Sequence, residues 1–185
     1  MRFVLVALAF IIGSSSASAA PVAPPITEFH QVTDNIYRGA LQGSAGLEAL
    51  SKMGIKTDLN LNNDEAQNDE EEAAAAAVGI RYIARPMSGF FAPRDSEVDE
   101  ILSILADKSN YPIYVHCLHG QDRTGLIVGL FRVFNQNWAP TAAYDEMLQY
   151  NFHTSLFLLN SYFKNRTGYQ QGFEADDVAL DRLYP

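Results

Sequence analysis

The sequence predicts an α/β sandwich, and three observations lead to this fold class. Short apolar segments typical of strands recur along the 185 residues, and most are followed by a segment with helical periodicity. One such strand, Ile113–Cys117, leads through a short loop into an apolar helix that begins near Arg123. Reactive side chains lie in that loop, at the carboxyl end of a strand, which is where open α/β sheets bind their ligands.

The first 19 residues are expected to be a signal peptide. Arg2 makes the start positive, residues 3–12 form an unbroken apolar run, and Ala17-Ser18-Ala19 is a typical cleavage site. We therefore expect an exported protein, periplasmic or secreted, because the apolar run is too short for a membrane anchor. The rest of the chain is expected to form a flexible, proline-containing arm at 20–28 and a single domain at 29–185.

Four segments besides Ile113–Cys117 predict strands. The first two are short and flank a turn at Thr33-Asp34-Asn35, whose residue types favour turns. The other two alternate apolar and polar residues, as a half-buried strand does. The predicted strands are two within 29–37, then 56–61, 81–86 and 113–117.

Six segments predict helices. The first is amphipathic and is ended by Gly54, and the third begins with Ser96 and Asp99 at the spacing of a capping box. In the last, Leu158 and Tyr162 are expected to belong to the core. The predicted helices are 45–53, 62–77, 96–106, 123–134, 141–150 and 155–164.

The formal net charge of −9 excludes nucleic acid and an anionic membrane as expected partners. The acidic run 62–77 lacks the spacing of a calcium loop, so we interpret it as a solvated helix face. No metal-ligand cluster or nucleotide-type phosphate loop is apparent in the sequence, so we expect no metal and no cofactor. The protein is expected to be a monomer. His30 and His153 are isolated and are interpreted as structural. With Cys117 as the only cysteine, an internal disulfide is impossible.

The loop after Cys117 predicts a phosphate-binding site. A tight loop at a helix N-terminus directs several backbone N–H groups to one point and adds the positive end of the helix dipole. Gly120 can adopt the positive φ that such a cradle requires. Arg123 adds a planar fork of donors that matches two phosphate oxygens. The expected cradle consists of Leu118, His119, Gly120 and Gln121.

The same surroundings favour covalent catalysis by Cys117. The helix dipole, the N–H groups and Arg123 would hold the cysteine as thiolate, which is its nucleophilic form. Thr124 can donate a hydrogen bond to the sulfur when it later leaves. Together these residues predict phosphoryl transfer through a cysteinyl-phosphate intermediate. Two alternatives to a catalytic role remain. The loop could bind phosphate without turnover, or Cys117 could be a buried structural cysteine.

The segment His116-Cys117-x5-Arg123-Thr124 resembles the signature loop of the cysteine-dependent phosphatases, the protein tyrosine phosphatase superfamily. The shorter loop of rhodanese-type sulfurtransferases does not fit. The resemblance implies a short, mostly parallel central sheet with helices on both faces. It also implies that His116 orients the loop and lowers the pKa of the thiol.

Two aspartates compete for the role of general acid, which must protonate the departing oxygen. The superfamily often carries this acid in the loop before the helix that precedes the signature strand, but here the usual position falls near Phe90. Asp122 is the first candidate, because myotubularin-type phosphatases resemble this chain in carrying Asp at that loop position. Like-charge repulsion from bound phosphate would favour its protonated form. Asp95 is the second candidate, and it could instead cap a helix.

An exported single-domain chain with this loop resembles the protein-tyrosine-phosphatase-like phytases. This resemblance implies hydrolysis of inositol hexakisphosphate, with a tyrosine or dual-specificity phosphoprotein phosphatase as the alternative. The substrate is thus a phosphorylated small molecule or a phosphopeptide. Cations that would bind it are Arg38, Arg85, Arg94 and His119, and Arg38 could equally be a surface residue.

Overall fold

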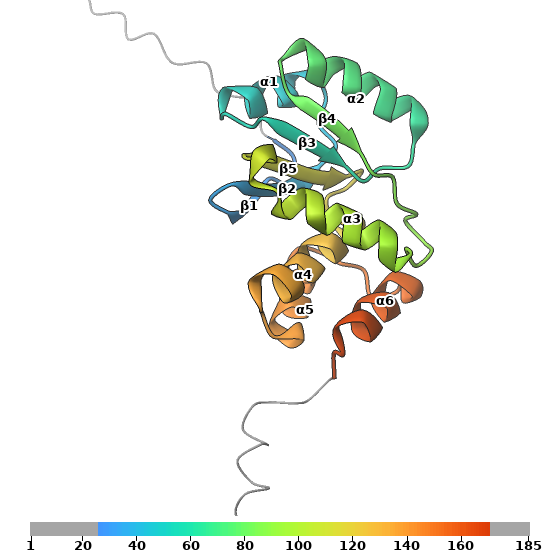
Figure 1. Cartoon of the computed structure of the whole chain (residues 1–185). Coiled ribbons are helices and arrows are strands. Elements are labelled where there is room, and N and C mark those ends of the chain that lie inside the picture. The colour runs from blue at the N-terminus through green and yellow to red at the C-terminus, as the bar shows by residue number, and fades with distance from the viewer. Residues whose placement is uncertain (1–25, 171–185) are drawn as a thin grey trace, which may run out of the picture.

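The computed structural model describes residues 26–170, which form one five-stranded sheet between two layers of helices (Figure 1). The strand order is β1-β2-β5-β3-β4. β1 pairs with β2 in antiparallel fashion, whereas β2, β5, β3 and β4 are parallel. The strands are β1 (His30–Thr33), β2 (Ile36–Ala40), β3 (Thr57–Asn60), β4 (Arg81–Ala84) and β5 (Ile113–Cys117). The predicted α/β class, with a mostly parallel sheet, is confirmed.

Helices cover both faces of the sheet, as expected (Figure 1). α1 and α2 lie on one face, and α3 and α4 lie on the other, where α5 and α6 pack against α4. The helices are α1 (Ser44–Lys52), α2 (Glu65–Ala77), α3 (Asp95–Ala106), α4 (Asp122–Gln136), α5 (Pro140–Gln149) and α6 (Phe157–Thr167), with a short 3-10 turn at Lys108–Asn110. No helix within 26–170 has the length and apolar character needed to cross a membrane.

β5 is the central strand, and all five of its residues are buried. Because successive side chains of a strand point to opposite faces, its residues serve two different layers. Val115 and Cys117 belong to the apolar core beneath α3 and α4, while Tyr114 packs with residues of α1 and α2. His116 points to that second face as well, where it meets Glu71 of α2. The alternation thus places Cys117 and His116 on opposite sides of the sheet.

Three expectations need correction or fall outside the described residues. α3 begins at Asp95, and its N-cap is Arg94, whose backbone N–H donates to the Glu97 carboxylate at 2.9 Å; the Ser96–Asp99 capping box is therefore wrong. Leu158 is 42 % exposed and is not a core residue, because the inward face of α6 is occupied by Leu159 and Phe163. The predicted signal peptide lies outside the described residues, as does most of the predicted arm.

Candidate active site

The loop between β5 and α4 closes tightly against β2. Gly120 has φ +73°, and a Cβ at this position would lie 2.5 Å from the carbonyl carbon and oxygen of Gly39. A side chain is therefore excluded at Gly120 both by the backbone conformation and by the neighbouring strand. Leu41, which directly follows β2, also contacts the loop, because its N–H donates to the Leu118 carbonyl at 3.3 Å.

Arg38 of β2 contacts this loop through its side chain. Its side chain is 1 % exposed, and Nη2 donates to the Gly120 carbonyl at 2.9 Å. The guanidinium also lies over the Tyr150 ring, 4.4 Å from the centroid. Burial lowers the pKa of Arg38 to about 10, which still leaves it charged at neutral pH. Arg38 is absent from the cavity that holds Cys117, so its expected contact with substrate is corrected to a contact with the loop.

Cys117 is 2 % exposed and lines a cavity of about 460 Å³. Burial by itself would raise the pKa of the thiol, but several groups outweigh it and lower the pKa below its ordinary value. They are the Thr124 hydroxyl, the Arg123 guanidinium, and the backbone N–H groups of Thr124 and Gly120. Hydrogen bonds and a positive charge that stabilise the thiolate create a nucleophile. These surroundings are the ones that the loop sequence predicts.

Arg123 is held by the segments that follow β3 and β4. Its Nη1 donates to Asn63 Oδ1 at 2.7 Å and to Asn62 Oδ1 at 3.4 Å, and the Met87 carbonyl accepts from it at 3.3 Å. Within residues 26–170, all hydrogen bonds of this side chain involve Nη1. Nε and Nη2 therefore remain for two oxygens of a phosphate group in a fork geometry.

The cavity contains five of the predicted site residues: Cys117, Leu118, His119, Asp122 and Arg123. Gly120 and Gln121 belong to the loop but not to the cavity lining, and Thr124 is fully buried below it. Six further lining residues come from elsewhere in the chain: Asn62, Asn63, Asp64, Gly89, Phe90 and Leu156. Asn62, Asn63 and Asp64 directly follow the predicted strand 56–61. Because carboxyl ends of parallel strands share one edge of a sheet, this position was a signal that could have identified them.

Three predicted site residues lie elsewhere. Arg85 forms an ion pair with Glu100 at 2.7 Å, and Arg94 is 80 % exposed and pairs with Glu97 at 2.6 Å. Asp95 accepts hydrogen bonds from Tyr162 and Arg166 at 2.8 and 2.9 Å, beside a separate cavity of about 500 Å³. None of the three lines the cavity that holds Cys117, so we correct their assignment to the site.

Asp122 has a partner that sequence reasoning did not identify. Its Oδ1 accepts a hydrogen bond from the His153 backbone N–H at 2.8 Å, and Nδ1 of the His153 ring lies 3.1 and 3.2 Å from the two carboxylate oxygens. The carboxylate is 19 % exposed, and the imidazole is 56 % exposed. The backbone and the ring of His153 thus hold the Asp122 carboxylate at the cavity wall.

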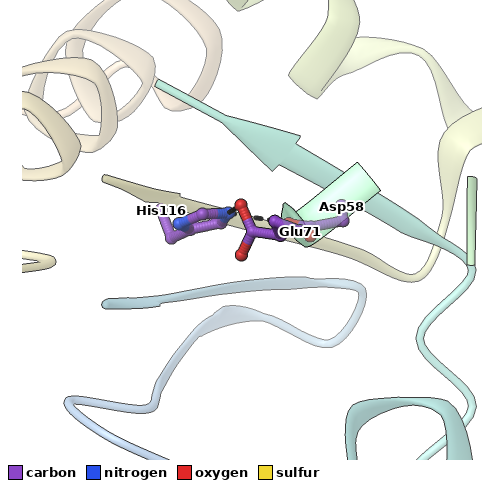
Figure 2. A group of neighbouring side chains, drawn as sticks. All are labelled: Asp58, Glu71 and His116. Atoms are coloured by element: carbon purple, nitrogen blue, oxygen red, sulfur yellow. Dashed lines mark ion pairs between the residues drawn. The ribbon is translucent and has the colours of Figure 1, made fainter. Parts of the chain in front are cut away.

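His116 lies in a buried cluster with Asp58 of β3 and Glu71 of α2 (Figure 2). Among the described histidines, cysteines and acids, this is the group whose ligand atoms are close enough to share a metal ion, all lying within 4.8 Å. The distances from His116 Nε2 are 3.0 Å to Asp58 Oδ1 and 3.3 Å to Glu71 Oε2. Burial would lower the pKa of His116, but the two carboxylates hold it well above its ordinary value. We therefore interpret the cluster as an ion cluster around an imidazolium.

Comparisons with known proteins agree with this geometry. A model described as "Tyrosine phosphatase family" matches residues 22–168. The chain is 26 % identical over 196 residues to dual specificity protein phosphatase TpbA of Pseudomonas aeruginosa (strain UCBPP-PA14), a match that covers 97 % of this chain and 84 % of that protein. It is 29 % identical over 127 residues to inositol diphosphatase DSP4 of Arabidopsis thaliana, covering 66 % of this chain and 63 % of that protein.

The fold is also that of a solved relative. The crystal structure of a P. aeruginosa TpbA variant in complex with pTyr superposes with a TM-score of 0.64 at 22 % identity, over 92 % of this chain and 99 % of that chain. TpbA and DSP4 are thus both named as phosphatases, but TpbA is named a protein phosphatase and DSP4 an inositol diphosphatase.

Proposed function

Because the chain belongs to the tyrosine phosphatase family, we propose a substrate for this phosphatase: phosphotyrosine in a protein or peptide. The proposal rests on the residues that line the cavity around Cys117. The cavity around Cys117 combines one arginine and one histidine with two aspartates and the apolar side chains of Phe90, Leu118 and Leu156. Such a lining suits one phosphate group attached to an aromatic ring.

A dense polyanion fits this lining less well. Binding inositol hexakisphosphate would require several cations to offset its charge, yet Arg85 and Arg94 are paired with glutamates away from the cavity. Asp64 would in addition repel a polyanion. Inositol phosphates are therefore the second candidate, which is supported by the similarity to the inositol diphosphatases of plants and yeast.

The proposed reaction has two steps. The Cys117 thiolate attacks phosphorus and the bond to the tyrosine oxygen breaks, while Asp122 donates a proton to that oxygen. Arg123 and the loop N–H groups bind the phosphoryl oxygens throughout. Water then attacks the cysteinyl phosphate, Asp122 accepts its proton, and the P–S bond breaks to release inorganic phosphate. Thr124 stabilises the departing thiolate. His153 positions the Asp122 carboxylate through its backbone N–H and its ring.

The substrate is tested by phosphate release from a phosphotyrosine peptide and from inositol hexakisphosphate, side by side under reducing conditions, with Cys117→Ser as blank. We expect kcat/KM for the peptide to exceed that for the inositol ester at least about tenfold. Phe90→Ala should lower the peptide value about fivefold, because a ring contact contributes about 1 kcal/mol.

Phe91→Ala is the matched control, since Phe91 is about as exposed as Phe90 (69 % against 73 %) but does not line the cavity. A preference for the inositol ester, or equal effects of Phe90→Ala and Phe91→Ala, would contradict the proposal.

The role of Asp122 is tested by comparing leaving groups. Asp122→Asn should lower kcat/KM, which reports the phosphorylation of Cys117, about 100-fold for an alkyl phosphate, whose oxygen must be protonated. For p-nitrophenyl phosphate, whose leaving group departs readily without a proton, the loss should be less than about fivefold. Asp95→Asn distinguishes the two sequence-based candidates, because only the true donor produces this difference between substrates. Equal losses on both substrates would remove Asp122 from the role.

A further inference from the structure

The Asp58–Glu71–His116 cluster lies on the opposite face of the sheet from the Cys117 side chain, and the reaction steps above do not use it. The three side chains come from β3, α2 and β5 and are 0 to 2 % exposed (Figure 2). Glu71 Oε2 also accepts a hydrogen bond from Asn60 Nδ2 at 2.6 Å. Within residues 26–170, the contact with His116 is the one polar contact of the Asp58 carboxylate. Burying a carboxylate without a partner costs free energy, so the contacts with His116 stabilise the buried positions of Asp58 and Glu71.

Both ring nitrogens of His116 face oxygen acceptors. Nε2 faces the two carboxylates, and Nδ1 lies 3.3 Å from the backbone carbonyl of Cys117. A carbonyl oxygen accepts hydrogen bonds only, and a neutral imidazole carries a single N–H. The doubly protonated ring is the form that presents an N–H to the Cys117 carbonyl and a positive charge to the two carboxylates at ion-pair distance.

The remaining titratable groups around the ring do not compensate for its charge. Tyr114 of β5 stacks on His116 with centroids 5.3 Å apart, and Tyr82 of β4 donates a hydrogen bond to neither carboxylate. Burial raises the pKa of both phenols above the ordinary value, so they remain neutral at physiological pH. Burial also raises the pKa of Glu71, with the charge of Asp58 acting in the same direction. Of the two carboxylates, that of Asp58 lies closer to Nε2, at 3.0 Å against 3.3 Å for Glu71.

We propose that Asp58 and Glu71 are positioning residues of the phosphatase reaction, which hold His116 as a doubly protonated ring whose second N–H fixes the Cys117 carbonyl. The catalytic loop begins at this carbonyl. The cluster thus links α2 to the first peptide of the loop, and the Leu61 N–H holds the same strand end by donating to the His116 carbonyl at 2.8 Å. This role concerns the nucleophile and does not depend on the substrate proposed above.

The protonation state is measured directly on the wild-type protein. We expect the ring ¹⁵N resonances of His116 at pH 7 to show two protonated nitrogens, with no titration between pH 6 and 8. A ring with one N–H at pH 7 would overturn the proposal. So would a stoichiometric metal ion in the purified protein that is lost on mutation of Asp58, because a metal would then occupy the position of the proton.

The positioning role is measured by the pH profile of Cys117 alkylation with iodoacetamide. Asp58→Asn should move the midpoint of this profile upward by about one pH unit, which lowers the alkylation rate constant about tenfold at a fixed pH below both midpoints. Glu72→Gln is the matched control, since Glu72 is the exposed neighbour of Glu71 on α2 and loses the same charge.

A double mutant separates positioning from general destabilisation. If Asp58 acts through His116, adding Asp58→Asn to His116→Gln should move the midpoint no further. An additional shift in the double mutant, or an unchanged midpoint in the folded Asp58→Asn protein, would overturn the proposal. Should Asp58→Asn fail to fold, Glu71→Gln provides the same test, both alone and combined with His116→Gln.

Discussion

Replacement of Cys117 by serine is expected to abolish turnover, with a loss of kcat of at least about 10⁴-fold on any phosphate monoester. The hydroxyl of serine is far less acidic than the thiol, and the groups that lower the pKa of Cys117 are too weak to ionise it. The covalent intermediate therefore cannot form. The loss is measured as phosphate release from an aryl phosphate at saturating substrate.

Binding should survive this substitution. Serine is close in size to cysteine, and Arg123 with its asparagine partners remains in place to bind the phosphate group. Cys117→Ser should thus still bind a phosphotyrosine peptide, within about fivefold of the wild-type KM. Turnover by the serine variant at a rate near that of the wild type would show that the thiol is not the nucleophile. Binding without turnover in the wild type would instead favour the non-catalytic phosphate-binding module.

The fold and the centre of the site were predictable because their signals are local in the sequence. The strands and helices follow from periodicity and from the glycines that end them, and the loop places Cys117 and Arg123 within one short segment. Parallel pairing of β2, β5 and β3 was expected only from the resemblance. Local patterns contain no information on which strands become neighbours.

The residues that complete the site were missed for the same reason. Asn63 contacts Arg123 across 60 positions of sequence, and His153 contacts Asp122 across 31. Asp58 appears in the sequence as one polar residue in an alternating strand, and Glu71 as one acid in a long acidic run. Their burial depends on how α2 packs on the sheet, which single-sequence periodicity does not specify.

The two misplaced arginines illustrate a limit of assigning pocket residues by charge. Arg85 and Arg94 were assigned because the net charge is negative and a phosphate ester needs cations. For Arg94 the competing partner was visible, since Glu97 lies three positions further along the helix that follows. For Arg85 the partner Glu100 is brought close only by the packing of α3.

Substitution of Arg123 by lysine is expected to lower kcat about 100-fold or more, while KM rises less than about tenfold. Lysine keeps the positive charge but cannot offer the planar fork, so it cannot bind two equatorial oxygens of the phosphoryl group as negative charge develops on them. It also cannot reproduce the Nη1 contacts to Asn62 and Asn63 that orient the side chain.

Arg94→Lys is the matched control for this prediction, because Arg94 carries the same side chain in an exposed ion pair on the same protein. It should change kcat and KM less than about twofold, as surface ion pairs contribute little. Steady-state kinetics on p-nitrophenyl phosphate and on a phosphotyrosine peptide measure both variants. If Arg123→Lys raised KM and left kcat unchanged, the arginine would bind ground state and transition state equally well. The Arg123 guanidinium would then contribute to substrate affinity alone, and the loop N–H groups would have to stabilise the transition state.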